Sequence, residues 1–142
     1  DIIASGITKG NGASILTILC NGSGYEALDN AGKAARKNSE LAYSSNIYPL
    51  QVQCGGNIDT QYALKAFIKQ FDGVAIVVCR DGFCHNIVGN TDMGRRIGLF
   101  REVLRSRRIS DQRIRIIKVL PGEGEALSQE LNTFAEELLK LK

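Results

Sequence analysis

Short apolar runs alternate four times with amphipathic helical patterns along this 142-residue chain, and that alternation limits the folds open to it. The apolar runs cover residues 15–20, 47–54, 74–79 and 113–120, and the helical patterns cover 25–38, 59–71, 92–107 and the stretch from about 125 onward. Strand–helix units in series form a parallel sheet whose strands are joined by right-handed crossovers. We therefore predict an α/β fold, a three-layer sandwich around one four-stranded parallel sheet.

Three of the four helical patterns carry an apolar stripe at helical spacing. In the second pattern, Leu64, Phe67, Ile68 and Phe71 recur on one helical face, and Asp59 is a plausible N-cap. In the third and fourth patterns the inner stripes consist of Met93, Ile97, Phe100 and Leu104, and of Leu127, Leu131, Phe134, Leu138 and Leu141. These stripes predict helices that pack against the faces of the sheet.

We expect the strand order 2-1-3-4, which makes the sheet flavodoxin/Rossmann-like. In that order the winding reverses between the first and third strands, and ligands of such sheets bind beyond the carboxyl ends of the strands at that switch point. Cys20 and Cys79 close the first and third apolar runs, Cys54 closes the second, and Cys84 follows Cys79 by five residues. Parallel strands would therefore gather all four sulfurs at one edge of the sheet.

Composition supports one ordinary domain, because 44% of the residues are hydrophobic and 23% are charged. Residues 1–13 are rich in Gly, Ser, Thr and Asn without a period, which predicts a flexible lead-in before a single domain over 14–142. No run approaches the ~20 apolar residues of a membrane span, and no secretory signal is evident, so we expect a cytoplasmic protein without membrane insertion. In a reducing compartment, clustered cysteines point to metal or redox chemistry rather than disulfides.

The positive charge of the chain is local. The formal net charge is only +3, yet eight arginines fall between Arg95 and Arg115. Such a run is typically a solvated helix face, and docking to an acidic partner is the next interpretation. Nucleic acid is not favoured, because no recognition motif accompanies the charge.

The spacing of the thiols bears on the ligand that they could share. Cys54 and Cys79 end strands two places apart, so their backbones would start roughly 10 Å apart. That separation suits an extended two-iron cluster better than one zinc ion, which holds four sulfurs at ~2.3 Å, and paired Cys-x2-Cys knuckles are absent. A packing role remains open for each cysteine, since free cysteine is among the most buried residue types.

Other interpretations concern the residues that follow Cys79. A strand that ends in Cys79-Arg80 with Gly82 after it looks like the active-site loop of rhodanese sulfurtransferases, an interpretation that leaves Cys20 and Cys54 unused. Arg80 could offset the negative charge of a thiolate site. His85 could replace one cysteine as a ligand, although a supporting role outside the ligands is favoured.

Three segments resemble the iron-sulfur delta subunit of methyl-viologen-reducing hydrogenases. They are the run that ends in Cys20, residues 53–59 around Cys54, and above all residues 79–90, which hold Cys79 and Cys84-His85. The resemblance continues through Arg95, Arg96 and residues 122–124, and it covers nearly the whole chain from Ile15. It departs from the family at residues 21–24, because family members commonly carry several cysteines in that loop.

This resemblance implies an electron-transfer subunit or domain rather than a self-sufficient enzyme. It implies one 2Fe-2S cluster held by Cys20, Cys54, Cys79 and Cys84, the four cysteines of the chain. The implied partners are a hydrogenase-like donor and a flavoprotein similar to heterodisulfide reductase A, to which the family is also found fused. A rhodanese-like sulfurtransferase that uses Cys79 and a cluster-free docking domain remain the alternatives.

Overall fold

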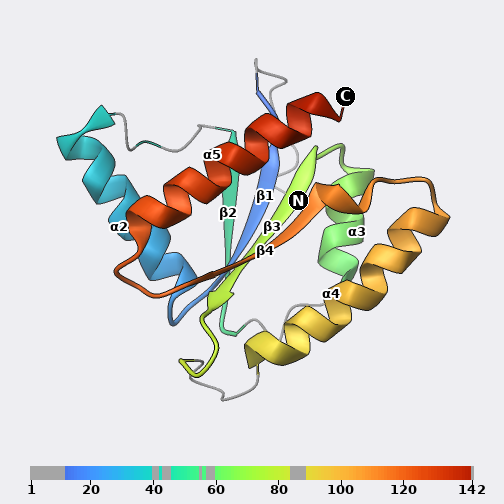
Figure 1. Ribbon diagram of the computed structural model, residues 1–142, viewed down its shortest axis with the longest axis horizontal. Coiled ribbons are helices and arrows are strands. Elements are labelled where there is room, and N and C mark those ends of the chain that lie inside the picture. Colours follow the sequence, from blue (N-terminus) through green and yellow to red (C-terminus); the bar gives the residue numbers. More distant parts are fainter. Residues whose placement is uncertain are drawn as a thin grey trace.

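The computed structural model of the protein describes residues 12–39, 42, 46–54, 56, 60–83 and 89–141, with the backbone alone at 89–92 (Figure 1). Its strands are β1 (Ile15–Cys20), β2 (Ile47–Val52), β3 (Gly73–Cys79) and β4 (Ile114–Val119). Its helices are α2 (Gly24–Lys37), α3 (Thr60–Ile68), α4 (Gly89–Ser106) and α5 (Gly124–Lys140), with a short 3-10 helix η3 (Asp111–Arg113) before β4. The lead-in predicted over 1–13 lies mostly outside the described residues, and Ala13 is already buried.

The four strands form one sheet in the order β2-β1-β3-β4, and every neighbouring pair is parallel. The predicted fold and strand order are therefore confirmed. The register aligns Leu19 with Val77 and Cys20 with Val52, so the strands end at nearly the same level. The carboxyl ends of all four strands consequently share one edge of the sheet.

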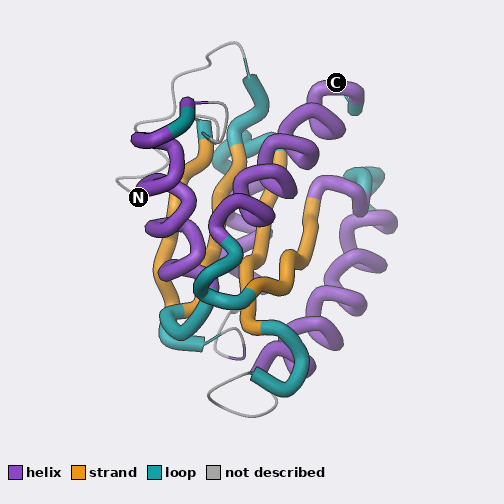
Figure 2. Tube along the Cα trace, turned by 60° about the vertical axis from the view of Figure 1, so that its left-hand side comes forward, coloured by secondary structure: helices purple, strands orange, loops and turns teal. Residues whose placement is uncertain are grey.

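Helices cover both faces of the sheet, and this gives the three layers seen in Figure 2. On one face α2 and α5 bury residues such as Ala27, Leu131 and Phe134 against β1 and β3. On the other face α3 and α4 bury Ala63, Ile97 and other apolar side chains in a second core. The interior strands β1 and β3 are buried along their whole length because both of their faces are covered.

The second strand differs from its prediction in length and in burial. It ends at Val52, so Cys54 lies two residues beyond it, and after the buried Ile47 its residues alternate between half-buried and exposed positions. β2 is an edge strand, and only one of its sides has a hydrogen-bonded neighbour. Pro49 lies in the middle of the strand and lacks a backbone N–H, which an edge strand tolerates.

Helix α3 also departs from its expected apolar stripe. Phe71 is buried beyond the end of the helix, and Phe67 packs partly buried against the second core. Leu64 and Ile68 are exposed, and the buried residues of the helix are Ala63 and Ala66. Their small side chains bring the helix close to the sheet, and larger residues on the flank are left outside. The N-cap predicted at position 59 falls outside the described residues.

Within the described residues, no helix combines the length and the apolar character needed to cross a membrane. The longest helix is α4, which begins three residues earlier than predicted, at Gly89. It carries four arginines over its length, and it therefore brings positive charge to the face of the sheet that it covers.

Candidate metal centre at the carboxyl edge of the sheet

Two of the four predicted site residues meet directly. Cys20 and Cys79 are the last residues of the neighbouring strands β1 and β3, and their Sγ atoms lie 3.7 Å apart. Both side chains are almost wholly buried, with 2% and 4% of their surface exposed. The paired strands therefore bring together two thiols that stand 59 residues apart in the sequence.

The separation of these two sulfurs can be compared with known bonding geometries. A disulfide would hold them about 2.05 Å apart, so they are two free thiols. Two thiolates bound to one tetrahedral metal at about 2.3 Å would lie roughly 3.8 Å apart. The observed distance matches that value, and it also equals an ordinary contact between two packed thiols. The geometry therefore allows the pair to accept one metal ion without rearrangement of the strands.

A backbone N–H group also points at Cys20. The Gly24 N–H, at the first residue of α2, donates to Cys20 Sγ at 3.2 Å. This approach depends on glycine, because a Cβ at this position would lie 2.6 Å from the Val77 carbonyl oxygen. A hydrogen bond of this kind stabilises negative charge on a sulfur and is one of the levers that set the potential of an iron–sulfur site.

Cys54 lies at the same edge, beyond the end of β2. It is buried, and the Gly56 N–H donates to its Sγ at 3.4 Å. The Gly56 carbonyl oxygen in turn accepts a hydrogen bond from Arg96 of α4 at 2.6 Å. Beside it, the Gln51 side chain donates to Asn21, which ties the loop after β1 to β2. Cys54 thus has the same kind of backbone donor as Cys20.

The turn that follows Cys79 is held by two ion pairs. Arg80 donates through Nε and Nη2 to both carboxylate oxygens of Glu123, at 2.6 and 2.7 Å. Asp81 accepts from Lys118 Nζ at 2.9 Å. The hydrogen bonds from Arg80 and from the Leu120 N–H lower the pKa of Glu123 to about 2. The charge of Arg80 is therefore matched by Glu123, and this weakens the expectation that it offsets a thiolate site.

The fourth predicted ligand, Cys84, and its neighbour His85 lie outside the described residues, so their positions stay predictions. Among the described residues, no three His, Cys, Asp or Glu side chains converge as a single-ion site. The Cys20–Cys79 pair with a separate Cys54 is a donor set that fits an extended cluster better than one ion. The residues present thus fit a cluster whose remaining ligand would come from outside the described part of the chain.

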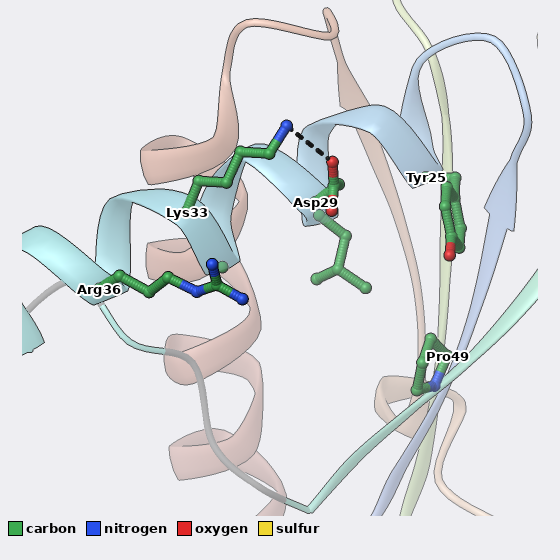
Figure 3. Close-up of a pocket in the computed structure, with 7 residues that line it drawn as sticks. Tyr25, Asp29, Lys33, Arg36 and Pro49 are labelled. Atoms are coloured by element: carbon green, nitrogen blue, oxygen red, sulfur yellow. Dashed lines mark ion pairs between the residues drawn. The ribbon is translucent and has the colours of Figure 1, made fainter.

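A surface hollow of about 280 Å³ lies between α2 and β2, and none of the described cysteines lines it (Figure 3). Tyr25 and Pro49 line one part of it, and Lys33 and Arg36 extend from α2 over another. Lys33 pairs with Asp29, and both side chains are more than half exposed. Because the charged groups of this hollow are solvated, it offers no chemistry comparable to that of the buried thiols.

Sequence reasoning missed the residues that support the thiols from a distance. Glu123 and Arg96 act on the site across 43 and 40 residues, and no local pattern pairs them with Arg80 and Gly56. The only available signal was that each falls in a segment of the family resemblance. Gly24 was visible as part of a glycine-containing loop, but its contact with the Val77 carbonyl required the packed fold.

The fold and the site together define a parallel α/β domain with a cysteine site at the carboxyl edge of its sheet. A family model described as "Methyl-viologen-reducing hydrogenase, delta subunit" matches residues 15–142. The chain therefore belongs to this family, and the resemblance seen in the sequence is confirmed.

Relatives of two kinds are similar to the chain. One kind includes a subunit of the ferredoxin/F(420)H(2)-dependent CoB-CoM heterodisulfide reductase of Methanosarcina acetivorans, 31% identical over 124 residues, which are 87% of this chain and 15% of that protein. The other kind includes an iron-sulfur subunit of the F420-non-reducing hydrogenase of Archaeoglobus profundus, 27% identical over 128 residues and 90% of both chains. The vhu iron-sulfur subunit of the same kind of hydrogenase in Methanocaldococcus jannaschii is 28% identical over 127 residues, 89% of this chain and 91% of that one. The chain thus spans a small part of the heterodisulfide reductase relatives and nearly all of the hydrogenase ones.

Proposed function

We propose that this chain is an electron-transfer module that binds one 2Fe-2S cluster through Cys20, Cys54, Cys79 and Cys84. The observation that carries the proposal is the 3.7 Å separation of Cys20 and Cys79 Sγ, two buried free thiols at the switch point of the sheet. The names of the hydrogenase relatives, which include the word iron-sulfur, support the choice of iron. When bound, such a cluster supplies one-electron transfer.

The contact between Cys20 and Cys79 suggests how the ligands divide between the two irons. These two sulfurs already have the spacing of ligands to one tetrahedral ion. Cys54 and the expected fourth ligand, Cys84, would then bind the second iron. The role of the protein would then be to position these thiols and to exclude water from them, since all three described thiols are buried.

The protein's own groups would also adjust the potential of the site. The Gly24 and Gly56 N–H groups donate to Cys20 and Cys54, and donors of this kind favour the more negative, reduced state.

The domain would relay electrons between a hydrogenase-like donor and a flavoprotein similar to heterodisulfide reductase A. The two kinds of relatives, one from a hydrogenase and one from a heterodisulfide reductase, support this choice of partners.

Anaerobic purification followed by iron and acid-labile sulfide analysis tests the proposal. We expect near two irons and two sulfides per chain, with a reduced-state EPR signal of a 2Fe-2S centre. Loss of a group outside the ligands already costs roughly 10–100-fold in metal affinity, so Cys20→Ser and Cys79→Ser should lose most of the iron. Thr17→Val, a buried change on the same strand as Cys20, serves as a control that should keep it.

Two other results would assign a different function. A colourless anaerobic protein that cannot be reconstituted would contradict the cluster and favour a cluster-free docking domain. Transferable sulfane sulfur on Cys79 would favour the sulfurtransferase. The structure gives that alternative little support, because Cys79 is buried against Cys20 and Arg80 is occupied by Glu123.

A further inference from the structure

Two buried thiols in contact have a second chemistry open to them besides metal binding. Cys20 and Cys79 end the neighbouring strands β1 and β3 (Figure 1), and their Sγ atoms are 3.7 Å apart without a disulfide between them. A disulfide bond holds its sulfurs about 2.05 Å apart, so each sulfur would have to move only about 0.8 Å toward the other. A small rotation about each Cα–Cβ bond supplies a movement of that size.

The backbone of the two strands also meets the requirements of a disulfide. The register aligns Leu19 with Val77. Cys20 and Cys79 follow these residues by one and two positions, so they differ in level by one residue. With strands ~4.8 Å apart and a rise of ~3.3 Å per residue, their Cα atoms are roughly 5.8 Å apart. Disulfides usually join Cα atoms about 4.4–6.8 Å apart, so the bridge can close while the strands stay paired.

We infer that Cys20 and Cys79 form a reversible disulfide when the chain carries no cluster. The inference goes beyond the proposed function, because it assigns these two residues a chemical modification that requires no metal. The oxidant is a small peroxide, and the reductant is a dithiol. Cys54 is not part of the bridge, because its sulfur is held in the loop after β2 by the Gly56 N–H.

The reaction with hydrogen peroxide proceeds in two steps. One sulfur attacks a peroxide oxygen, the O–O bond breaks, and a sulfenic acid and one water are formed. The other sulfur then attacks the sulfenic sulfur, so that the S–S bond forms and the S–O bond breaks with loss of a second water. The two thiols lose two electrons and two protons, and the peroxide takes them up. A dithiol returns both by thiol–disulfide exchange and is itself oxidised to a disulfide.

Burial decides which oxidant reaches the pair. Only 2% of Cys20 and 4% of Cys79 is exposed, and the rate of thiol oxidation depends on access. Hydrogen peroxide is scarcely larger than water, whereas a peptide disulfide such as oxidised glutathione is far bulkier. We therefore expect peroxide to close the bridge faster than oxidised glutathione does at the same concentration.

The disulfide and a cluster exclude one another. A metal ligand must be a thiolate, and a sulfur within a disulfide is not one. The oxidised chain therefore lacks two of the four proposed cluster ligands, and bound iron in turn keeps both sulfurs from bridging. The pair would thus act as a redox-sensitive control of cluster assembly. This consequence rests on the proposed function, whereas formation of the disulfide does not.

The test uses the full chain, freed of iron with a chelator, reduced, and then treated with a stoichiometric amount of hydrogen peroxide. The number of thiols that can be titrated after denaturation should fall from four to two. Trypsin leaves each cysteine in a different peptide, which allows mass spectrometry of the alkylated digest to identify the bridge. The peptides are 10–33, 38–65, 70–80 and 81–95. We expect 10–33 linked to 70–80, and loss of the link with dithiothreitol.

Two variants separate the disulfide from the cluster. Cys54→Ser removes a proposed ligand, so it should lose most of the iron and still form the link between 10–33 and 70–80. Cys20→Ser should lose both the iron and the link. Iron uptake by the oxidised wild type should be lost and should return after dithiothreitol. The peptide map of the wild type needs no substitution, so it decides the question even if a serine variant does not fold.

Several results would overturn the inference. They are a native chain that keeps all four thiols in peroxide, a bridge between another pair such as Cys79 and Cys84, and a link that joins two chains. An oxidised chain that takes up iron as readily as the reduced one would contradict the control of cluster assembly. A chain that forms the bridge and binds no iron in either state would support the disulfide and contradict the proposed cluster.

Discussion

Thr17 carries a hydroxyl in the middle of the buried strand β1. Its Oγ1 and Ser128 Oγ are the two buried side-chain polar atoms of the described residues that lack a hydrogen-bond partner. A buried polar group without a partner keeps its full desolvation cost. Thr17→Val should therefore raise the free energy of unfolding by about 1 kcal/mol, measured by urea denaturation of the cluster-free protein.

A second hydroxyl of the chain provides the contrast. Ser14 Oγ donates to Asp72 and accepts from the Asp72 N–H, so its polar atom is satisfied. Ser14→Ala should lower the free energy of unfolding by about 1 kcal/mol. A loss of stability in Thr17→Val similar to that of Ser14→Ala would show that Thr17 has a hydrogen-bond partner in solution.

At the same scale, the sequence allowed part of the site to be predicted. The apolar runs that end at Cys20 and Cys79 predicted the ends of β1 and β3. The parallel pairing of these two strands is then enough to bring the two sulfurs together. Cys54 was predicted to end the second strand, because polar Gln51 and Gln53 continue the alternation of apolar and polar residues up to it. The strand ends at Val52, two residues earlier. The support from Glu123 depends on its pairing with Arg80 across 43 residues, which no local pattern reveals.

At the scale of the elements, the first residue of α2, Gly24, packs so closely on the sheet that no side chain fits there. A Cβ on Gly24 would approach the Val77 carbonyl oxygen to 2.6 Å, so Gly24→Ala must displace the start of the helix. We expect a loss of roughly 1–3 kcal/mol in the free energy of unfolding. With its donor to Cys20 displaced, the reduction potential of a bound cluster should also become more negative, which redox titration would detect.

A glycine in α4 is the matched control for this substitution. A Cβ on Gly98 would meet no atom within 4 Å, so Gly98→Ala should instead stabilise the protein by roughly 0.5–1 kcal/mol through helix propensity. The potential should not move in this variant. A Gly24→Ala protein with unchanged stability and potential would contradict the tight packing of α2 on β3.

The helices also show where sequence patterns are ambiguous. The apolar residues of α4 and α5 repeat over many turns, and their inner stripes were predicted correctly, with Ile97 and Leu131 wholly buried. α3 has only nine residues, and two apolar sets at helical spacing compete in it. Ala63 and Ala66 are buried against the sheet, and Phe67 packs partly against the same core. Leu64 and Ile68 are left exposed.

For the whole molecule, the ion pair between Arg80 and Glu123 predicts part of the dependence of stability on pH. It joins the end of β3 to the turn before α5, and it lowers the pKa of Glu123 from 4.5 to about 2. A depressed pKa in the folded state means that the stabilisation is complete above about pH 4.5 and is lost as the pH falls toward 2. The effect should be small, because both side chains are partly exposed.

Glu123→Gln tests this link. The variant should unfold more easily than the wild type at pH 7, and the two should converge as the pH approaches 2, in urea denaturation of the cluster-free protein across that range. Glu130→Gln, a change on the exposed face of α5, should leave the curve as it is. A constant difference between Glu123→Gln and the wild type at every pH would mean that the side chain acts without its charge.

Each edge strand of the sheet has one feature that hinders the addition of a further strand. Pro49 removes a backbone donor from the middle of β2, and Arg101 donates a hydrogen bond to the carbonyl oxygen of Ile114 at the start of β4. Exposed strand edges otherwise recruit strands from neighbouring chains. A domain with blocked edges can be appended to unrelated polypeptides without merging with their sheets, and the matching region makes up 90% of one relative and 15% of another. Such edges would let one domain of this family be part of different polypeptides without strand exchange.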